Sequence, residues 1–173
     1  SMAYSSPWLE VAVNTLTPRR GVWEGESTDA EGVLEALRAN GVEPRGRRVA
    51  VIGCGGAGRA AALGLAVAGA EVVLANRGPE RGMAAARSLG LPFVPLAELG
   101  EARTAGALAD GFEIYVHATP VGRRSADELP LPVARLAPNA GVVDLVNGGA
   151  PTPRGVEARR RGLQAIDGRE VLL

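Results

Sequence analysis

The segment from Arg48 to Ala61 constrains the fold more than any other part of the chain. A short apolar, β-prone run ends there in a G-x-G-x-x-G pattern, and the last glycine opens an alanine-rich helix. Gly53 allows a tight turn, Gly55 lets the backbone approach a pyrophosphate, and Gly58 lets the helix pack closely on the strand. Unpaired N–H groups at the helix start attract phosphate. The pattern predicts a dinucleotide site for NAD, NADP or FAD; the alternative is a purely structural glycine turn.

Strands and helices are expected to alternate along most of the chain. Strand patterns lie at 49–52, 71–75, 114–117, 141–146 and 163–166, and helical patterns at 28–41, 57–68, 79–90 and 152–162. Such alternation predicts an α/β fold, a Rossmann-type doubly wound parallel sheet. Residues 29–173 are therefore predicted to form a single dinucleotide-binding domain. Residues 1–28 resemble a hairpin and are predicted to be the hinge or tail of a missing substrate domain at the N-terminal side.

Composition argues against several classes of function. The 173 residues are enough for one domain with a core, and 46% of them are hydrophobic. The 19 basic and 19 acidic residues balance, so neither a nucleic-acid partner nor an anionic membrane surface is expected. Residues 60–70, the longest apolar run, are too few to span a bilayer. The single Cys54 and the lack of a visible signal peptide predict a cytoplasmic location, and no metal site is predicted.

The choice between NAD and NADP depends on the end of the strand at 71–75. NAD-binding domains usually carry Asp or Glu there, which holds the ribose 2′-hydroxyl and repels a 2′-phosphate. This chain instead has Asn76 and Arg77, and Arg81 follows one turn into the next helix. A guanidinium pairs well with a doubly charged phosphate. The sequence therefore predicts NADP over NAD; the alternative is a pair of surface arginines.

Seven motifs carry a resemblance to a known family. They are Val13-Asn14-Thr15-Leu16, Ser27-Thr28-Asp29-Ala30-Glu31-Gly32, Gly53-Cys54-Gly55-Gly56-Ala57-Gly58-Arg59-Ala60, Asn76-Arg77, Ala118-Thr119-Pro120-Val121-Gly122, Val143-Asp144-Leu145-Val146 and Thr152-Pro153. In order and spacing they resemble the shikimate dehydrogenase family over residues 11–173, with fusions to dehydroquinate dehydratase as one possible parent. The resemblance implies NADP-dependent, reversible reduction of 3-dehydroshikimate to shikimate, a step of aromatic amino acid biosynthesis.

The resemblance also implies which residues form the site. The expected cofactor-binding residues are Gly53, Gly55, Gly56, Ala57, Gly58, Asn76, Arg77, Arg81, Thr119, Pro120 and Val121. Family members have an N-terminal domain that holds the small-molecule substrate and supplies a catalytic Lys, which pairs with the Asp that matches Asp29 here. All 19 basic residues of this chain are Arg. We therefore expect Asp29 to be catalytic in the full-length parent, and this chain alone to bind NADPH without turnover. The alternative for Asp29 is stabilisation of a helix N-terminus.

Departures from the family pattern cluster where substrate and nicotinamide are expected. They are Ser27, Gly78, His117, Arg123 and Asn147, where the family has Asn, Thr, Asn, Met and Tyr. His117 is either a group that titrates near neutral pH or a hydrogen-bonded substitute for Asn. Asp144 is interpreted as a strand-end loop residue. The departures leave two alternatives open, a quinate dehydrogenase and a degenerate, non-catalytic nucleotide-binding module.

Overall fold

The computed structural model describes residues 28–99, 111–121, 136, 138–146 and 151–171, and the backbone of 15–19 and 22–26. Its strands are β1 (Thr15–Arg19), β2 (Val22–Glu26), β3 (Arg48–Ile52), β4 (Glu71–Asn76), β5 (Phe93–Pro95), β6 (Ile114–His117), β7 (Gly141–Asp144) and β8 (Gln164–Asp167). Its helices are α1 (Thr28–Ala39), α2 (Gly56–Val67), α3 (Pro79–Leu89), α4 (Pro153–Arg160) and α5 (Gly168–Val171), with one 3₁₀ turn, η1 (Leu96–Glu98). Among these described elements, none is a helix with the length and apolar character needed to cross a membrane.

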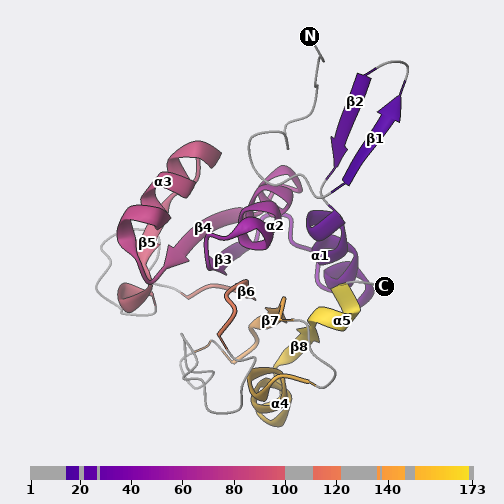
Figure 1. The fold of residues 1–173 in the computed structure, drawn as a ribbon. Coiled ribbons are helices and arrows are strands. Elements are labelled where there is room, and N and C mark those ends of the chain that lie inside the picture. The colour runs from indigo at the N-terminus through magenta and orange to yellow at the C-terminus, as the bar shows by residue number, and fades with distance from the viewer. Residues whose placement is uncertain are drawn as a thin grey trace.

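Six strands form one parallel sheet (Figure 1). Their order across the sheet is β5-β4-β3-β6-β7-β8, so the chain moves outward from β3 and then crosses back to continue from β6. This is the strand order of a Rossmann fold, and its switch point lies between β3 and β6. The predicted fold class, a doubly wound parallel sheet, is confirmed.

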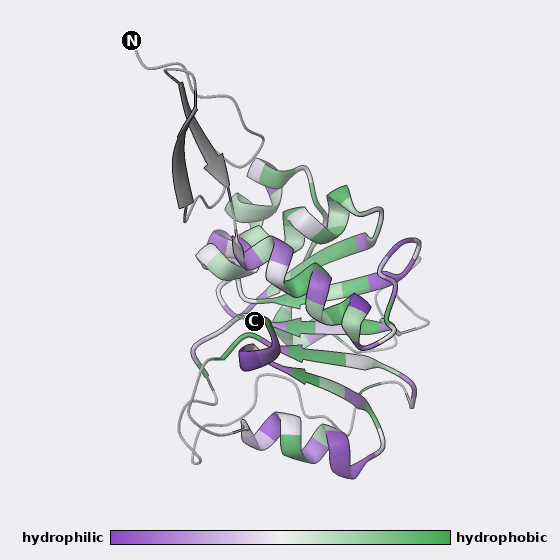
Figure 2. Ribbon diagram, turned by 90° about the vertical axis from the view of Figure 1, so that its right-hand side faces the viewer, coloured by the Kyte–Doolittle hydropathy of each residue, from purple (hydrophilic) through white to green (hydrophobic). Residues whose placement is uncertain are grey.

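Helices cover both faces of the sheet because the strands are apolar on both sides. On β3, Val49 and Val51 pack into a core cluster with α1 and α2, whereas Ala50 and Ile52 belong to a second cluster on the opposite face. Helix α4 packs on that opposite face through Ala158, next to Val142 of β7. Figure 2 shows the consequence, a sheet of largely hydrophobic strands between helices that carry their hydrophilic residues outward.

The first two strands form a separate two-stranded antiparallel sheet, with Thr15 opposite Glu26 and Arg19 opposite Val22. The sequence predicts a strand at 11–16, a turn that includes Pro18, and a return at 22–24. The structure instead continues the strand through Pro18, and residues 11–14 lie outside the described part. A proline lacks an N–H donor but is tolerated at a sheet edge, and both strands here are edges.

Two short elements were not expected from the sequence. Strand β5 has only three residues and ends in Pro95, so it lacks the alternation that marks a longer strand. It pairs with β4 at Leu74–Phe93 and forms the outer edge of the sheet. Helix α5 is a single turn that packs against α1, where a Cβ on Gly32 would collide with the Val171 carbonyl oxygen. Both elements are defined by tertiary contacts rather than by local pattern.

Candidate functional site

The candidate site lies along the edge where the parallel strands end. Strand register aligns Ala75, Ile52, His117, Asp144 and Asp167 in one row across β4, β3, β6, β7 and β8. The loops that follow these residues therefore meet at the same edge of the sheet. In folds of this class, ligands bind in the crevice at this edge, beside the switch point.

The glycine-rich turn after β3 packs directly on the loop after β6. Gly53 has φ of +108°, a left-handed conformation, and a Cβ at this position would lie 2.7 Å from the Ala118 carbonyl oxygen. A Cβ on Gly58 would collide with the carbonyl oxygen of Gly53. These two glycines are thus required by the packing of the chain itself.

Gly55 and Gly56 behave differently from the other two fingerprint glycines. A Cβ added to either would find no atom within 4 Å, so the chain does not fill this space. Helix α2 begins here with Gly55 as N-cap, which provides no side-chain cap, and the first turn carries no acidic residue. Uncapped N–H groups at a helix start suit an anion. The residues present therefore fit the pyrophosphate of a dinucleotide, with Ala57 in the same first turn.

Asn76, Arg77 and Arg81 follow the neighbouring strand at the same edge. Asn76 ends β4, and its side-chain amide donates to the Gly78 carbonyl oxygen over 2.9 Å, which fixes the turn into α3. Arg77 and Arg81 are exposed to solvent. Gly78 is the N-cap of α3 and supplies no side-chain cap. Two exposed guanidiniums beside an uncapped helix start form a suitable environment for a phosphate.

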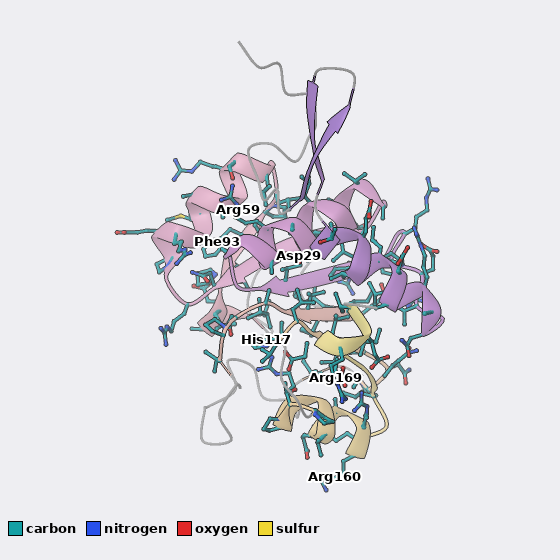
Figure 3. All side chains as sticks on the ribbon, turned by 45° about the vertical axis from the view of Figure 1, so that its right-hand side comes forward. Asp29, Arg59, Phe93, His117, Arg160 and Arg169 are labelled. Carbon is teal, nitrogen blue, oxygen red and sulfur yellow. The ribbon has the colours of Figure 1, made fainter. Side chains whose placement is uncertain are left out.

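The environment of Cys54 shows that positive charge reaches the glycine-rich turn. Burial raises the pKa of the Cys54 thiol, while the charges of Arg81 and Arg59 act in the opposite direction. Arg81 belongs to α3 and Arg59 to α2 (labelled in Figure 3), so the two helices contribute charge to the same turn. The buried, free thiol is a probe of this field rather than a reactive group.

Thr119, Pro120 and Val121 lie on the other side of the switch point. The Thr119 hydroxyl oxygen accepts a hydrogen bond from the Val121 N–H over 3.2 Å, which closes the turn. The Thr119 methyl carbon lies 2.8 Å from the position of a Cβ on Gly53. The loop therefore borders the glycine-rich turn, as the sequence-based site predicts.

His117 and Asp144 form a buried pair at the ends of β6 and β7. His117 Nδ1 lies 3.0 Å from Asp144 Oδ1, and the two side chains are 2% and 3% exposed. The other ring nitrogen, Nε2, lies 2.6 Å from the Thr119 hydroxyl oxygen. Both nitrogens of His117 are thus engaged. The interpretation of Asp144 as a loop residue is wrong, because it ends a strand and is buried against His117.

Asp144 is the centre of a larger polar cluster. Its Oδ1 also accepts from the Val146 N–H over 3.1 Å, and its Oδ2 accepts from the Thr152 hydroxyl over 2.7 Å. Arg154 Nη1 lies 4.0 Å from the same Oδ2, and both Nη atoms of Arg154 are buried without a hydrogen-bond partner among the described residues. Thr152 also caps α4 by accepting from the Gly155 N–H.

The charges in this cluster are set by burial and by contact. Burial alone would raise the pKa of Asp144, but hydrogen bonds from His117 and Thr152 and the charge of Arg154 outweigh it, so the pKa is lowered. Burial lowers the pKa of His117, with a further contribution from Arg154, against the effect of Asp144. Asp144 is therefore an anion near a cation, and the histidine between it and Thr119 is neutral at neutral pH.

Asp29 lies in the first turn of α1 and is half-buried. The next residue, Ala30, contacts α2, since a Cβ on Gly64 would lie 2.8 Å from the Ala30 Cβ. The structure places Asp29 near the surface of the domain (Figure 3), and among described residues its contacts do not distinguish a catalytic from a capping role. Ser27, Arg123 and Asn147 lie outside the described residues.

Sequence reasoning missed the Asp144-centred cluster. The ends of adjacent parallel strands were available as a signal, because the predicted order places 114–117 beside 141–146. Arg154 had no such signal, since it follows a helix cap in a position that usually faces solvent.

The fold and the edge of the sheet define a dinucleotide-binding domain of the kind that serves nicotinamide coenzymes. A protein-family model described as NADP oxidoreductase, coenzyme F420-dependent, matches residues 48–148. The chain belongs to this family, and the expected NADP cofactor class and oxidoreductase class are confirmed at the level of the family.

Individual relatives narrow the resemblance. The shikimate dehydrogenase (NADP(+)) of Acidiphilium cryptum is 45% identical over 94% of this chain and 56% of its own length. The corresponding protein of one Thermus thermophilus strain is 42% identical over 93% of this chain and 57% of its own length. A crystal structure of shikimate 5-dehydrogenase from a second strain of Thermus thermophilus, in complex with NADP(H) and shikimate, has a TM-score of 0.79 at 36% identity, covering 99% of this chain and 62% of that one. The predicted resemblance to shikimate dehydrogenases is confirmed, and the chain spans little more than half the length of these relatives.

Proposed function

We propose that this chain is the NADP-binding half of a shikimate dehydrogenase. The observation that carries the proposal is the space above Gly55 and Gly56, which the chain leaves open at an uncapped helix start. Two exposed arginines, Arg77 and Arg81, stand beside it where an NAD-binding domain has an acid. An open phosphate cradle with cationic neighbours favours a nucleotide that carries an additional phosphate.

Each part of the edge has a distinct task in this proposal. The backbone of Gly55, Gly56 and Ala57 binds the pyrophosphate at the N-terminus of α2. Arg77 and Arg81 bind the 2′-phosphate, and Asn76 fixes the turn that presents them. The loop at Thr119–Val121 positions the nicotinamide beside the switch point. When bound, the nicotinamide supplies the hydride acceptor or donor for an alcohol–ketone pair.

We propose that the substrate site is completed by a further domain. The resemblance predicts that residues 1–28 are its hinge and that residues 29–173 form the cofactor domain. Asp29, in the first turn of α1, is then the residue that faces the substrate from this side and pairs with a lysine of the other domain. The free thiol of Cys54 agrees with a reducing, cytoplasmic setting.

Two alternatives have specific support. A quinate dehydrogenase would use the same cofactor site with a different carbinol. A non-catalytic nucleotide-binding module is favoured by the replacement of Asn by His117 within the nicotinamide loop. These alternatives share the NADP site and differ in turnover.

Two measurements test the proposal. NADPH binding to the 173-residue chain is followed by nucleotide fluorescence, and a specific, saturable complex is expected. The full-length protein is then assayed with NADP⁺ and either shikimate or quinate. Shikimate oxidation supports the proposal, preference for quinate supports the first alternative, and NADPH binding without oxidation of either supports the second. Failure of the chain to bind NADPH would contradict all three.

A further inference from the structure

Three side chains connect the cofactor cradle to the interior by continuous hydrogen bonds. Thr119 borders the glycine-rich turn, His117 lies behind it (labelled in Figure 3), and Asp144 lies behind His117. The two steps are 2.6 Å from the Thr119 hydroxyl oxygen to His117 Nε2, and 3.0 Å from His117 Nδ1 to Asp144 Oδ1. A hydroxyl, an imidazole and a carboxylate in this order can move a proton.

The partners of Asp144 determine where the histidine proton lies. Asp144 is held as a carboxylate, so its Oδ1 is an acceptor, and His117 Nδ1 must carry a hydrogen. If Nδ1 were bare, two acceptors would face each other across 3.0 Å. In the neutral ring, Nε2 then holds a lone pair, and the Thr119 hydroxyl donates to it.

The surrounding charges keep the histidine neutral. Arg154 of α4 compensates the charge of Asp144, so the pair does not need an imidazolium for balance. Asp167 of β8, in register with Asp144, pairs with Arg169 and Arg159 on the far side. Burial and Arg154 together lower the pKa of His117, which leaves Nε2 available as a base at neutral pH.

Thr119 retains one free acceptor position. A hydroxyl has one hydrogen and two lone pairs. The hydrogen goes to His117 Nε2, and one lone pair accepts from the Val121 N–H. The second lone pair is the remaining hydrogen-bonding position at the half-buried edge of the cradle.

We propose that Thr119, His117 and Asp144 form a proton relay for an alcohol substrate bound at this edge. The inference rests on the proposed function, which supplies the alcohol and the hydride acceptor. As the carbinol carbon loses hydride, the hydroxyl proton of the substrate moves to Thr119 Oγ1, and the proton of Thr119 moves to His117 Nε2. A ketone forms, and the imidazolium is stabilised by Asp144. The proton returns through Thr119 to water after the ketone leaves.

A purely structural role would have the same hydrogen bonds but other consequences. If His117 merely replaces an Asn and anchors the loop, its protonation state would not affect turnover. The relay instead requires the neutral Nδ1–H tautomer and a hydroxyl at position 119.

The first test is a spectrum of the imidazole. His117 is the sole histidine among the 173 residues, so labelling with ¹⁵N-histidine gives signals from one ring. At about pH 7.5, about one unit above the ordinary pKa of histidine, the expected result is one protonated nitrogen, Nδ1, and one unprotonated nitrogen, Nε2. Thr119→Val is expected to shift the Nε2 signal, and Thr119→Ser to restore it.

The second test uses turnover by the full-length protein at saturating NADP⁺. Thr119→Val is expected to lower kcat by about 100-fold or more, the range for loss of an acid–base group, while Thr119→Ser retains most of it. Wild-type kcat is expected to fall at low pH as His117 is protonated, and His117→Asn to remove this dependence. Thermal unfolding of each variant shows that the fold is retained.

The outcomes separate the two proposals. An Nε2–H tautomer or an imidazolium at about pH 7.5 overturns the relay whatever the turnover. Wild-type kcat with an unchanged pH profile in Thr119→Val also overturns it. A wild-type protein that binds NADPH but oxidises neither shikimate nor quinate contradicts the proposed function, while the spectrum still decides whether His117 can accept the proton.

Discussion

Gly53 and Ala118 lie so close together that a Cβ on Gly53 would stand 2.7 Å from the Ala118 carbonyl oxygen. The contact joins the turn after β3 to the loop after β6 and thereby closes the base of the switch point. It explains why one fingerprint glycine is required for folding, while Gly55, which borders open space, is available for a ligand.

The two kinds of glycine are expected to respond differently to alanine. Gly55 has φ of −76° and ψ of −175°, which alanine adopts easily. Gly55→Ala is therefore expected to leave stability unchanged or raise it by about 0.4–1 kcal/mol, yet to weaken NADPH binding at least tenfold, about 1.4 kcal/mol. Gly58→Ala is expected to destabilise the fold by about 1–3 kcal/mol. Urea denaturation and nucleotide titration measure the two effects, and unchanged NADPH affinity in Gly55→Ala would argue against the cradle.

Arg77 is expected to contribute specifically to recognition of the 2′-phosphate. Arg77→Ala should weaken NADPH binding by about 1–3 kcal/mol, the range for charged hydrogen bonds, and leave NADH nearly unaffected. Arg87→Ala is a matched control, because Arg87 is an exposed arginine in the last turn of the adjoining helix, α3. Fluorescence titration with both nucleotides measures the difference. An equal loss for NADPH and NADH, or an equal loss in the control, would exclude this role.

Burial of a neutral His117 makes stability depend on pH. Its pKa in the folded chain is lowered from 6.5, so the unfolded chain binds the proton first. The contribution is fully present above about pH 6.5 and is lost as the pH falls toward the folded-state pKa. We expect the free energy of unfolding to fall between about pH 7.5 and about pH 5.5, and His117→Asn to reduce this fall. Denaturation curves at the two pH values would refute the burial of a neutral ring if both proteins changed equally.

Asp167 predicts a second pH dependence at lower pH. Its hydrogen bonds with Arg169 lower its pKa from 3.8 to about 2. The stabilisation is therefore present above about pH 4 and is lost as the pH falls from 3.8 to about 2. Because Arg169 is half-exposed, solvent screening limits the effect to about 1 kcal/mol. Acid unfolding of the wild type and of Asp167→Asn should converge below about pH 2.5, and curves that stay parallel down to that pH would contradict the assignment.

Local pattern predicted those parts of the molecule that local pattern determines. The strand at Arg48–Ile52, its glycine-rich turn and the following helix carry alternation, turn residues and helical spacing within one short segment. Strand β5 has no such pattern, because three residues ending in Pro95 become a strand only by pairing with β4. The role of Asp144 depends on two neighbours that are distant in sequence, His117 and Arg154. A buried polar cluster of this kind requires the strand order to be known before its members can be assigned to one another.

The most direct test of the account compares NADP⁺ and NAD⁺ in calorimetric titrations of the same 173-residue chain. The open cradle at Gly55 and the guanidiniums of Arg77 and Arg81 predict that NADP⁺ binds at least tenfold more tightly, a difference of about 1.4 kcal/mol. Because the extra contact is ionic, the preference should also shrink as salt is added. Equal affinities for the two coenzymes, or no binding of either, would contradict it.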